Sequence, residues 1–93
     1  MNNQEQVDLL EKEQIIGHLA NKSYQAFIKT FIEEKRIVLF ETFQEISIRD
    51  TDDLLEVKRM LMTLDALEIE IKALIDTGKM ASQKLNQQPM DKH

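Results

Sequence analysis

The chain has no cysteine, no tryptophan, one proline and two glycines among its 93 residues. Without cysteine, neither a disulfide nor a thiolate metal site can supplement the hydrophobic core. Because proline and glycine are scarce, few residues are available to end helices or form tight turns, and this favours long helices over many short strands. The chain is instead rich in Leu, Ile, Glu, Lys and Gln, which are mostly good helix formers. We therefore expect a single small all-α domain spanning residues 1–93.

Long apolar runs and an excess of positive charge are also missing. The longest run of large apolar residues is Ile37-Val38-Leu39-Phe40, whereas about 20 residues are needed to cross a bilayer. The N-terminus lacks a basic region followed by an apolar segment, so we expect no secretory signal. The net charge of −5 disfavours non-specific binding to nucleic acid or to anionic membranes. These features predict a cytoplasmic protein that does not act on membranes.

No group of residues has the spacing of a catalytic or metal site. His18 is the only histidine away from the C-terminus, and no cysteine or second nearby histidine accompanies it. The densest acidic cluster, Asp50 to Glu56, lacks the glycine and the spacing of a calcium-binding loop and is better explained by helix capping. We expect no catalytic residue, no metal ligand, no cofactor and no enzymatic activity.

Two long helices are predicted from hydrophobic periodicity. The first spans 21–47, with Asn21 as its N-cap, and the second spans 51–77, with Asp50 as its N-cap and Asp52 and Asp53 in its first turn. Gly78 is expected to end the second helix in the left-handed conformation. The apolar positions that define the first helix share one face: Tyr24, Phe27, Ile28, Phe31, Ile32, Val38, Leu39, Phe43 and Ile46.

Shorter segments flank these helices. Residues 6–20 predict a short helix whose apolar residues scatter around its axis and whose Gly17 lowers helix preference by about 1 kcal/mol. It is either an ordinary first helix that closes a three-helix domain or an arm that packs only in an assembly. Residues 79–88 predict a short helical tail, and residues 89–93, which begin with Pro89, are expected to be disordered.

The short turn between the two long helices predicts an antiparallel hairpin. With the turn centred near residues 48 and 49, residues whose numbers sum to about 97 should lie level. Phe43 then lies near Leu54, and Phe31 lies near Ala66. Such a hairpin covers one broad face of the second helix.

A second apolar stripe on the second helix consists of Leu55, Met62 and Ile69, which recur every seven residues. Ile37 and Phe40 similarly stand off the main face of the first helix. The hairpin cannot cover this stripe by itself, so either the short first helix or another molecule must do so. We therefore predict a protein–protein interface at these five residues and association as a homodimer or higher oligomer.

Four basic residues offer an alternative. The hairpin register places Lys35, Arg36, Lys58 and Arg59 at a similar height, so a small nucleic-acid contact is conceivable. Glu33, Glu34 and Glu56 lie among them, and pairing with these acids is the simpler explanation.

Residues 19–85 resemble a family of small helical proteins of tailed phages, often encoded among head and packaging genes. The matching features are Asn21, Phe27, Arg49-Asp50, Met60-Leu61, Leu64-Asp65 and Ile75-Asp76-Thr77-Gly78-Lys79-Met80-Ala81. The resemblance implies a phage accessory protein that acts by contact. Together with the uncovered apolar stripe, it leads us to expect a phage or prophage protein, in the host cytoplasm or the virion, that contacts itself and another phage or host protein. A DNA-packaging or regulatory subunit and an inhibitor of a host enzyme are the alternatives.

Overall fold

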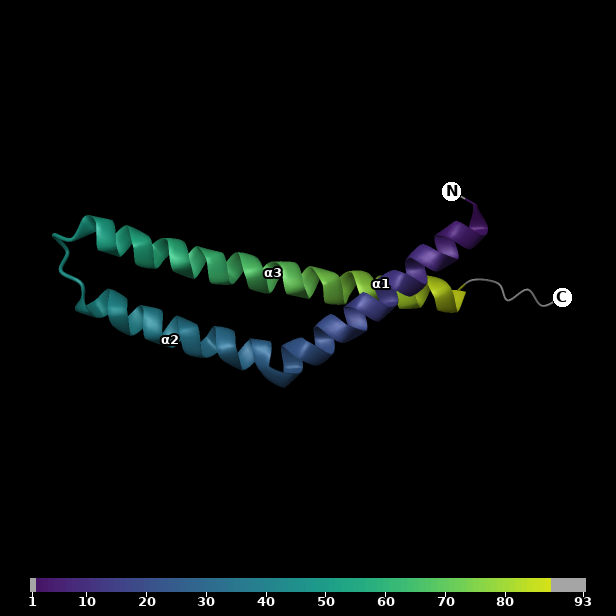
Figure 1. Ribbon diagram of the computed structural model, residues 1–93, viewed down its shortest axis with the longest axis horizontal. Coiled ribbons are helices and arrows are strands. Elements are labelled where there is room, and N and C mark those ends of the chain that lie inside the picture. Colours follow the sequence, from purple (N-terminus) through teal and green to yellow (C-terminus); the bar gives the residue numbers. More distant parts are fainter. Residues whose placement is uncertain (1, 88–93) are drawn as a thin grey trace.

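The computed structural model describes residues 2–87, and this part of the chain forms an all-α hairpin, as predicted (Figure 1). The chain runs from α1 (Asn3–Ser23) through a π-helix, η1 (Tyr24–Ile28), into α2 (Lys29–Glu45), and returns along α3 (Thr51–Gln87). The predicted disorder of residues 89–93 and the last residue of the predicted tail lie outside the described residues.

The predicted boundary between residues 20 and 21 is wrong, because α1 continues through Asn21 to Ser23 and leads directly into η1. Asn21 therefore caps nothing. The helix begins instead after Asn2, whose side-chain oxygen accepts a hydrogen bond of 2.7 Å from the backbone N–H of Glu5. At η1 the backbone N–H of Lys29 donates to the carbonyl of Tyr24, five residues earlier. This wider turn inserts one extra residue, and the helix bends there (Figure 1).

The turn between α2 and α3 forms where it was predicted. Ile46 adopts an extended backbone conformation and ends α2. The backbone N–H of Asp50 then donates to the Ser47 carbonyl at 2.9 Å. Helix α3 begins at the next residue, with Asp52 and Asp53 in its first turn. Their negative charges interact favourably there with the positive end of the helix dipole.

The predicted end of the second long helix at Gly78 is also wrong. Helix α3 continues to Gln87, and no glycine among the described residues has a positive φ. The predicted tail, as far as it is described, is thus the last part of α3. Gly78 is buried in the helix, where it packs against α1, so its lack of a side chain serves close packing.

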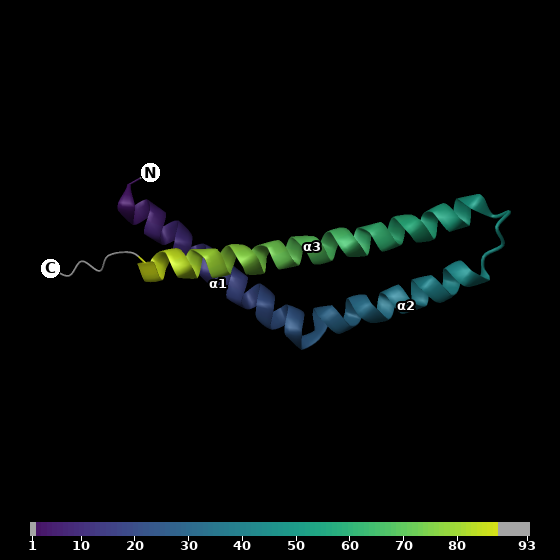
Figure 2. The same ribbon diagram turned by 180° about the vertical axis from the view of Figure 1, so that it is seen from behind.

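Helix α3 presents a row of residues with alternating spacings of three and four to the rest of the chain, as in an antiparallel coiled coil. We call this row the seam. Its members are Leu54, Val57, Leu61, Leu64, Glu68, Ile71, Ile75, Gly78, Ser82 and Leu85, each buried or half-buried. The N-terminal half of α3 packs on α2, and its C-terminal half packs more closely on α1, which crosses it in both views (Figures 1 and 2).

The part of the hairpin formed by α2 and the N-terminal half of α3 is a single layer of helices, whereas α1 lies across the C-terminal half of α3 (Figures 1 and 2). The molecule measures 14 Å along its shortest axis, and its radius of gyration is 19.9 Å, compared with about 12 Å for a compact domain of this length. A layer one helix thick has no second layer to cover its two flat sides. The side chains that remain exposed on these two sides therefore form the surface that a partner could contact.

Candidate functional site

Most large apolar side chains of the described chain are exposed. The buried hydrophobic residues are Leu10, Tyr24, Ile32, Val57, Ile75 and Ala81, whereas eighteen large hydrophobic residues are exposed. Single exposed apolar residues are ordinary on protein surfaces, but contiguous patches mark contact sites. The candidate site is therefore a contact surface.

The five residues of the predicted interface are all exposed in the single chain. Ile37 and Phe40 lie on α2, and Leu55, Met62 and Ile69 lie on α3; we call this set the Met62 face. Met62 is 59% exposed and Ile69 is 67% exposed. Helix α1 packs farther along α3, around Gly78, so the alternative in which the first helix covers this stripe is not what the structure shows.

The flat sides of the hairpin differ, and helix geometry assigns residues to each. In a pair of antiparallel helices, the residues that come just before a seam residue in the sequence lie on the same flat side of the pair for both helices. The residues that come just after a seam residue lie on the other flat side. Arg36 of α2 bonds to Asp65, which follows the seam residue Leu64. A hollow of about 580 Å³ on the same side is lined by Ile37, Phe40 and Leu61 among others. The Met62 face belongs to this side.

A second apolar row lies on the opposite side. Its members are Phe27, Phe31 and Val38 from η1 and α2, together with Met60, Leu67 and Leu74 from α3, and we call it the Met60 face. Each of these side chains is between 44% and 62% exposed. Periodicity placed Phe27, Phe31 and Val38 on the main apolar face of the first predicted helix, and Met60, Leu67 and Leu74 lie on the broad face of the second helix that the hairpin was expected to cover. The seam is too narrow to bury these side chains, so about half of each remains at the surface.

A polar cluster joins α3 to the π-helix η1 and to α2. The Tyr24 hydroxyl donates to one oxygen of Glu68 at 2.9 Å, and Arg36 donates to the other at 3.1 Å and to Asp65 at 2.6 Å. Glu68 is thus held from η1 and from α2 at once, although it occupies a seam position. Its side chain is 16% exposed, so two donors offset the cost of partly burying its charge.

This cluster shifts the pKa values of its members. Burial, followed by the hydrogen bond to Glu68, raises the pKa of Tyr24 above 10.0. The hydrogen bond from Tyr24 and that from Arg36 lower the pKa of Glu68, although its partial burial acts in the opposite direction. Because the pKa of Tyr24 is higher in the folded than in the unfolded chain, the protonated hydroxyl stabilises the fold at pH values below the unfolded-state pKa. This contribution is lost as the pH rises through the folded-state pKa.

We expect an ultraviolet titration of the phenolate to give a midpoint above 10.0 for Tyr24, with a loss of stability through that range. Tyr24 is the only tyrosine and the chain has no tryptophan, so the signal reports this side chain alone. Glu68→Gln removes the carboxylate and should bring the midpoint back toward the ordinary value. An ordinary midpoint in the folded wild-type chain would contradict the cluster.

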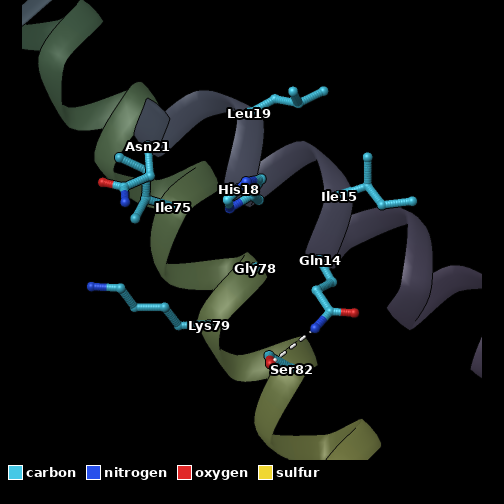
Figure 3. Close-up of a pocket in the computed structure, with 10 residues that line it drawn as sticks. Gln14, Ile15, His18, Leu19, Asn21, Ile75, Gly78, Lys79 and Ser82 are labelled. Carbon is cyan, nitrogen blue, oxygen red and sulfur yellow. Dashed lines mark hydrogen bonds between the residues drawn. The ribbon is translucent and has the colours of Figure 1, made fainter. Parts of the chain in front are cut away.

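Helices α1 and α3 cross at two glycines. A Cβ atom added to Gly17 would lie 2.6 Å from the Cα of Gly78, and one added to Gly78 would lie 2.7 Å from the Cα of Gly17. Real Cβ atoms do not approach so closely, so the crossing requires glycine on both helices. Beside it, the side chain of Gln14 donates to the Ser82 hydroxyl at 3.0 Å (Figure 3).

The crossing leaves a hollow of about 420 Å³ whose lining includes His18, Asn21 and Lys79 (Figure 3). Ile15 and Leu19 project away from it in this view. Within residues 2–87, no group of three His, Cys, Asp or Glu side chains is placed to hold a metal ion. The hollow therefore offers a few polar groups but no combination with an evident reaction.

Three of the four basic residues of the alternative site, Lys35, Arg36 and Arg59, interact with other side chains of the hairpin. Arg36 pairs with Asp65 and Glu68, and Arg59 pairs with Glu56 at 3.4 Å. The ammonium of Lys35 lies 5.5 Å from the centre of the Phe31 ring, on the side of the hairpin opposite Arg36. Arg59 pairs with Glu56, one of the acids that the simpler explanation named. Arg36 pairs instead with two acids of α3, Asp65 and Glu68.

Sequence reasoning missed the two glycines, the polar cluster and the Met60 face. The predicted register gave a signal for the glycine contact, because the residue numbers of Gly17 and Gly78 sum to 95, close to the predicted 97. A signal for the π-helix also existed. The seam-facing positions Tyr24, Ile28, Ile32 and Arg36 are spaced by four residues three times in succession, which an unbroken heptad pattern does not allow.

No described helix combines the length and apolar character that crossing a membrane requires. Comparison of the chain with protein-family models, with curated proteins and with solved structures gave no match in any of the three. The functional argument therefore depends on the geometry above.

Proposed function

We propose that this chain is a non-enzymatic accessory or assembly protein that acts through helix-mediated contacts with itself and with another protein. The observation that carries the proposal is the distribution of its apolar residues. Six hydrophobic side chains are buried in the described hairpin, while eighteen large ones remain exposed along helices that form one layer except where α1 crosses α3. Burying them against other molecules is the way such a layer gains stability.

The resemblance to phage head and packaging proteins supports a role in a phage or prophage. The partners are then a second copy of the chain and another phage or host protein, met in the host cytoplasm or in the virion. A nucleic-acid function has less support, because the chain carries a net charge of −5 and both Arg36 and Arg59 are paired with carboxylates.

Sedimentation velocity of the full chain at micromolar concentration tests the proposal. We expect a dimer or larger species whose population increases with concentration, because association shields apolar surface from water. Added salt should leave the association intact, since the exposed faces are apolar rather than charged. A monomer throughout the micromolar range, with full helicity by circular dichroism, would remove the basis for self-association.

A further inference from the structure

We propose that the Met60 face, and not the Met62 face, is the surface through which two copies of this chain associate. This inference rests on the proposed self-association and assigns it a surface and a geometry. The first observation is the relation of each face to the seam. Met60, Leu67 and Leu74 immediately precede the seam residues Leu61, Glu68 and Ile75, so their inner halves already belong to the core.

Helix α3 consequently has an apolar surface three positions wide in each heptad on this side. That width is typical of helices in the core of a four-helix bundle, whereas a two-helix seam needs only two positions. The Met62 face lies farther from the seam, and its α3 residues alternate with charged Lys58, Asp65 and Lys72. A bundle core is therefore favoured on the Met60 side.

The second observation is that the two rows of the Met60 face match one another in height. The residue numbers of Phe27 and Leu74 sum to 101, and those of Phe31 and Leu67 sum to 98. The side-chain contacts of η1 and α2 with α3 join residues whose numbers sum to 92 (Tyr24 and Glu68), 101 (Arg36 and Asp65) and 104 (Arg36 and Glu68). The sums of 98 and 101 lie within this range, so these residues lie at similar heights across the hairpin. The residue numbers of Val38 and Met60 sum to 98, so this pair also lies at a similar height on the two helices.

This match makes the face complementary to itself. A two-fold axis parallel to the helices places α2 of one copy on α3 of the other, in opposite directions and at unchanged height. The aromatic row of each copy then packs on the aliphatic row of its partner, twice. A partner with another sequence would need to reproduce this match, whereas a second copy supplies it automatically.

Charge and area agree with this occupant. Two copies that each carry a net charge of −5 repel unless they meet through surface without negative charge. Lys35 and Thr42 lie between the two rows, whereas Thr63 lies beyond the α3 row, at the heptad position that Glu56 and Glu70 share with it. The carboxylates of α3 on this side therefore border the apolar rows at the outer edge. From Met60 to Leu74 it extends about 21 Å along α3 and about 20 Å across the two helices. Side chains make its accessible area larger than this outline of about 420 Å², in the direction of the about 800 Å² per partner of a standard interface.

Matched variants on one helix test the inference by sedimentation of the full chain. Leu67→Glu places a charge in the proposed interface, and we expect the dissociation constant of the dimer to rise at least tenfold. Ile69→Glu, two residues away on the Met62 face, should leave it unchanged. Circular dichroism of each variant checks that the helices remain. If Ile69→Glu dissociates the dimer and Leu67→Glu does not, the inference fails while self-association stands. A monomeric wild-type chain would defeat both.

Cross-linking provides a readout that does not depend on the tolerance of Leu67 for a charge. Because the chain has no cysteine, each introduced cysteine is unique. A mixture of Val38→Cys and Met60→Cys chains should form a disulfide between copies on mild oxidation. A mixture of Ile37→Cys and Met62→Cys chains, which carries the same chemistry on the other side, should form little. Preferential cross-linking in the second mixture would overturn the inference.

Discussion

Gly17→Ala should destabilise the fold by about 1–3 kcal/mol, the usual cost of forcing a methyl group into a packed contact. Alanine is intrinsically the better helix former by about 1 kcal/mol, so the expected sign is opposite to the helix-propensity prediction. The reason is that the added Cβ would lie 2.6 Å from the Cα of Gly78 and 2.9 Å from the carbonyl oxygen of Leu74. These are backbone atoms, and only a separation of the two helices can relieve the overlap.

Chemical denaturation at a fixed protein concentration, followed by circular dichroism, measures this change. Ala73→Gly on the exposed surface of α3 serves as the control and should cost only the intrinsic difference of about 1 kcal/mol. Gly78→Ala should resemble Gly17→Ala. Stabilisation by Gly17→Ala would mean that α1 does not cross α3 at this point.

Ile32→Ala should cost about 2–5 kcal/mol, the range for removing a fully buried aliphatic side chain. Ile32 is 0% exposed and is the largest fully buried side chain among the described residues. In a chain whose hairpin buries so few apolar residues, a loss of this size is a large part of a total stability of about 5–15 kcal/mol.

Ile37→Ala is the matched control, since it removes the same atoms from the same helix at a side chain that is 58% exposed. We expect a change within about 0.5 kcal/mol. The two variants can be compared by urea denaturation at one protein concentration. Equal losses would mean that α2 does not face α3 through Ile32, or that Ile37 is covered by another molecule.

The periodicity of the sequence was sufficient for the helices and for their antiparallel return. The acidic residues after Asp50 located the start of α3, because capping depends on neighbours within one turn. Both wrongly placed boundaries, at Asn21 and at Gly78, came from residues that also occur inside helices. Asparagine and glycine favour helix ends only in the absence of tertiary contacts.

The candidate surface was predicted in part. The exposure of Leu55, Met62 and Ile69 agrees with the expectation that the hairpin leaves this stripe uncovered. The exposure of Phe31 and Leu67 does not follow from periodicity, which places them on the same broad face as Ile32 and Leu64. How much of a broad face becomes buried depends on whether one partner helix or several pack against it.

The sequence by itself determined that this protein consists of long amphipathic helices with more apolar surface than one hairpin can bury, because helix periodicity and capping are local properties. Only the tertiary structure decided that Gly17 meets Gly78, that Glu68 receives Tyr24 and Arg36, and that the uncovered surface has two sides. These contacts join residues 32 to 61 positions apart, and their formation depends on the angle at which the π-helix directs α1 across α3.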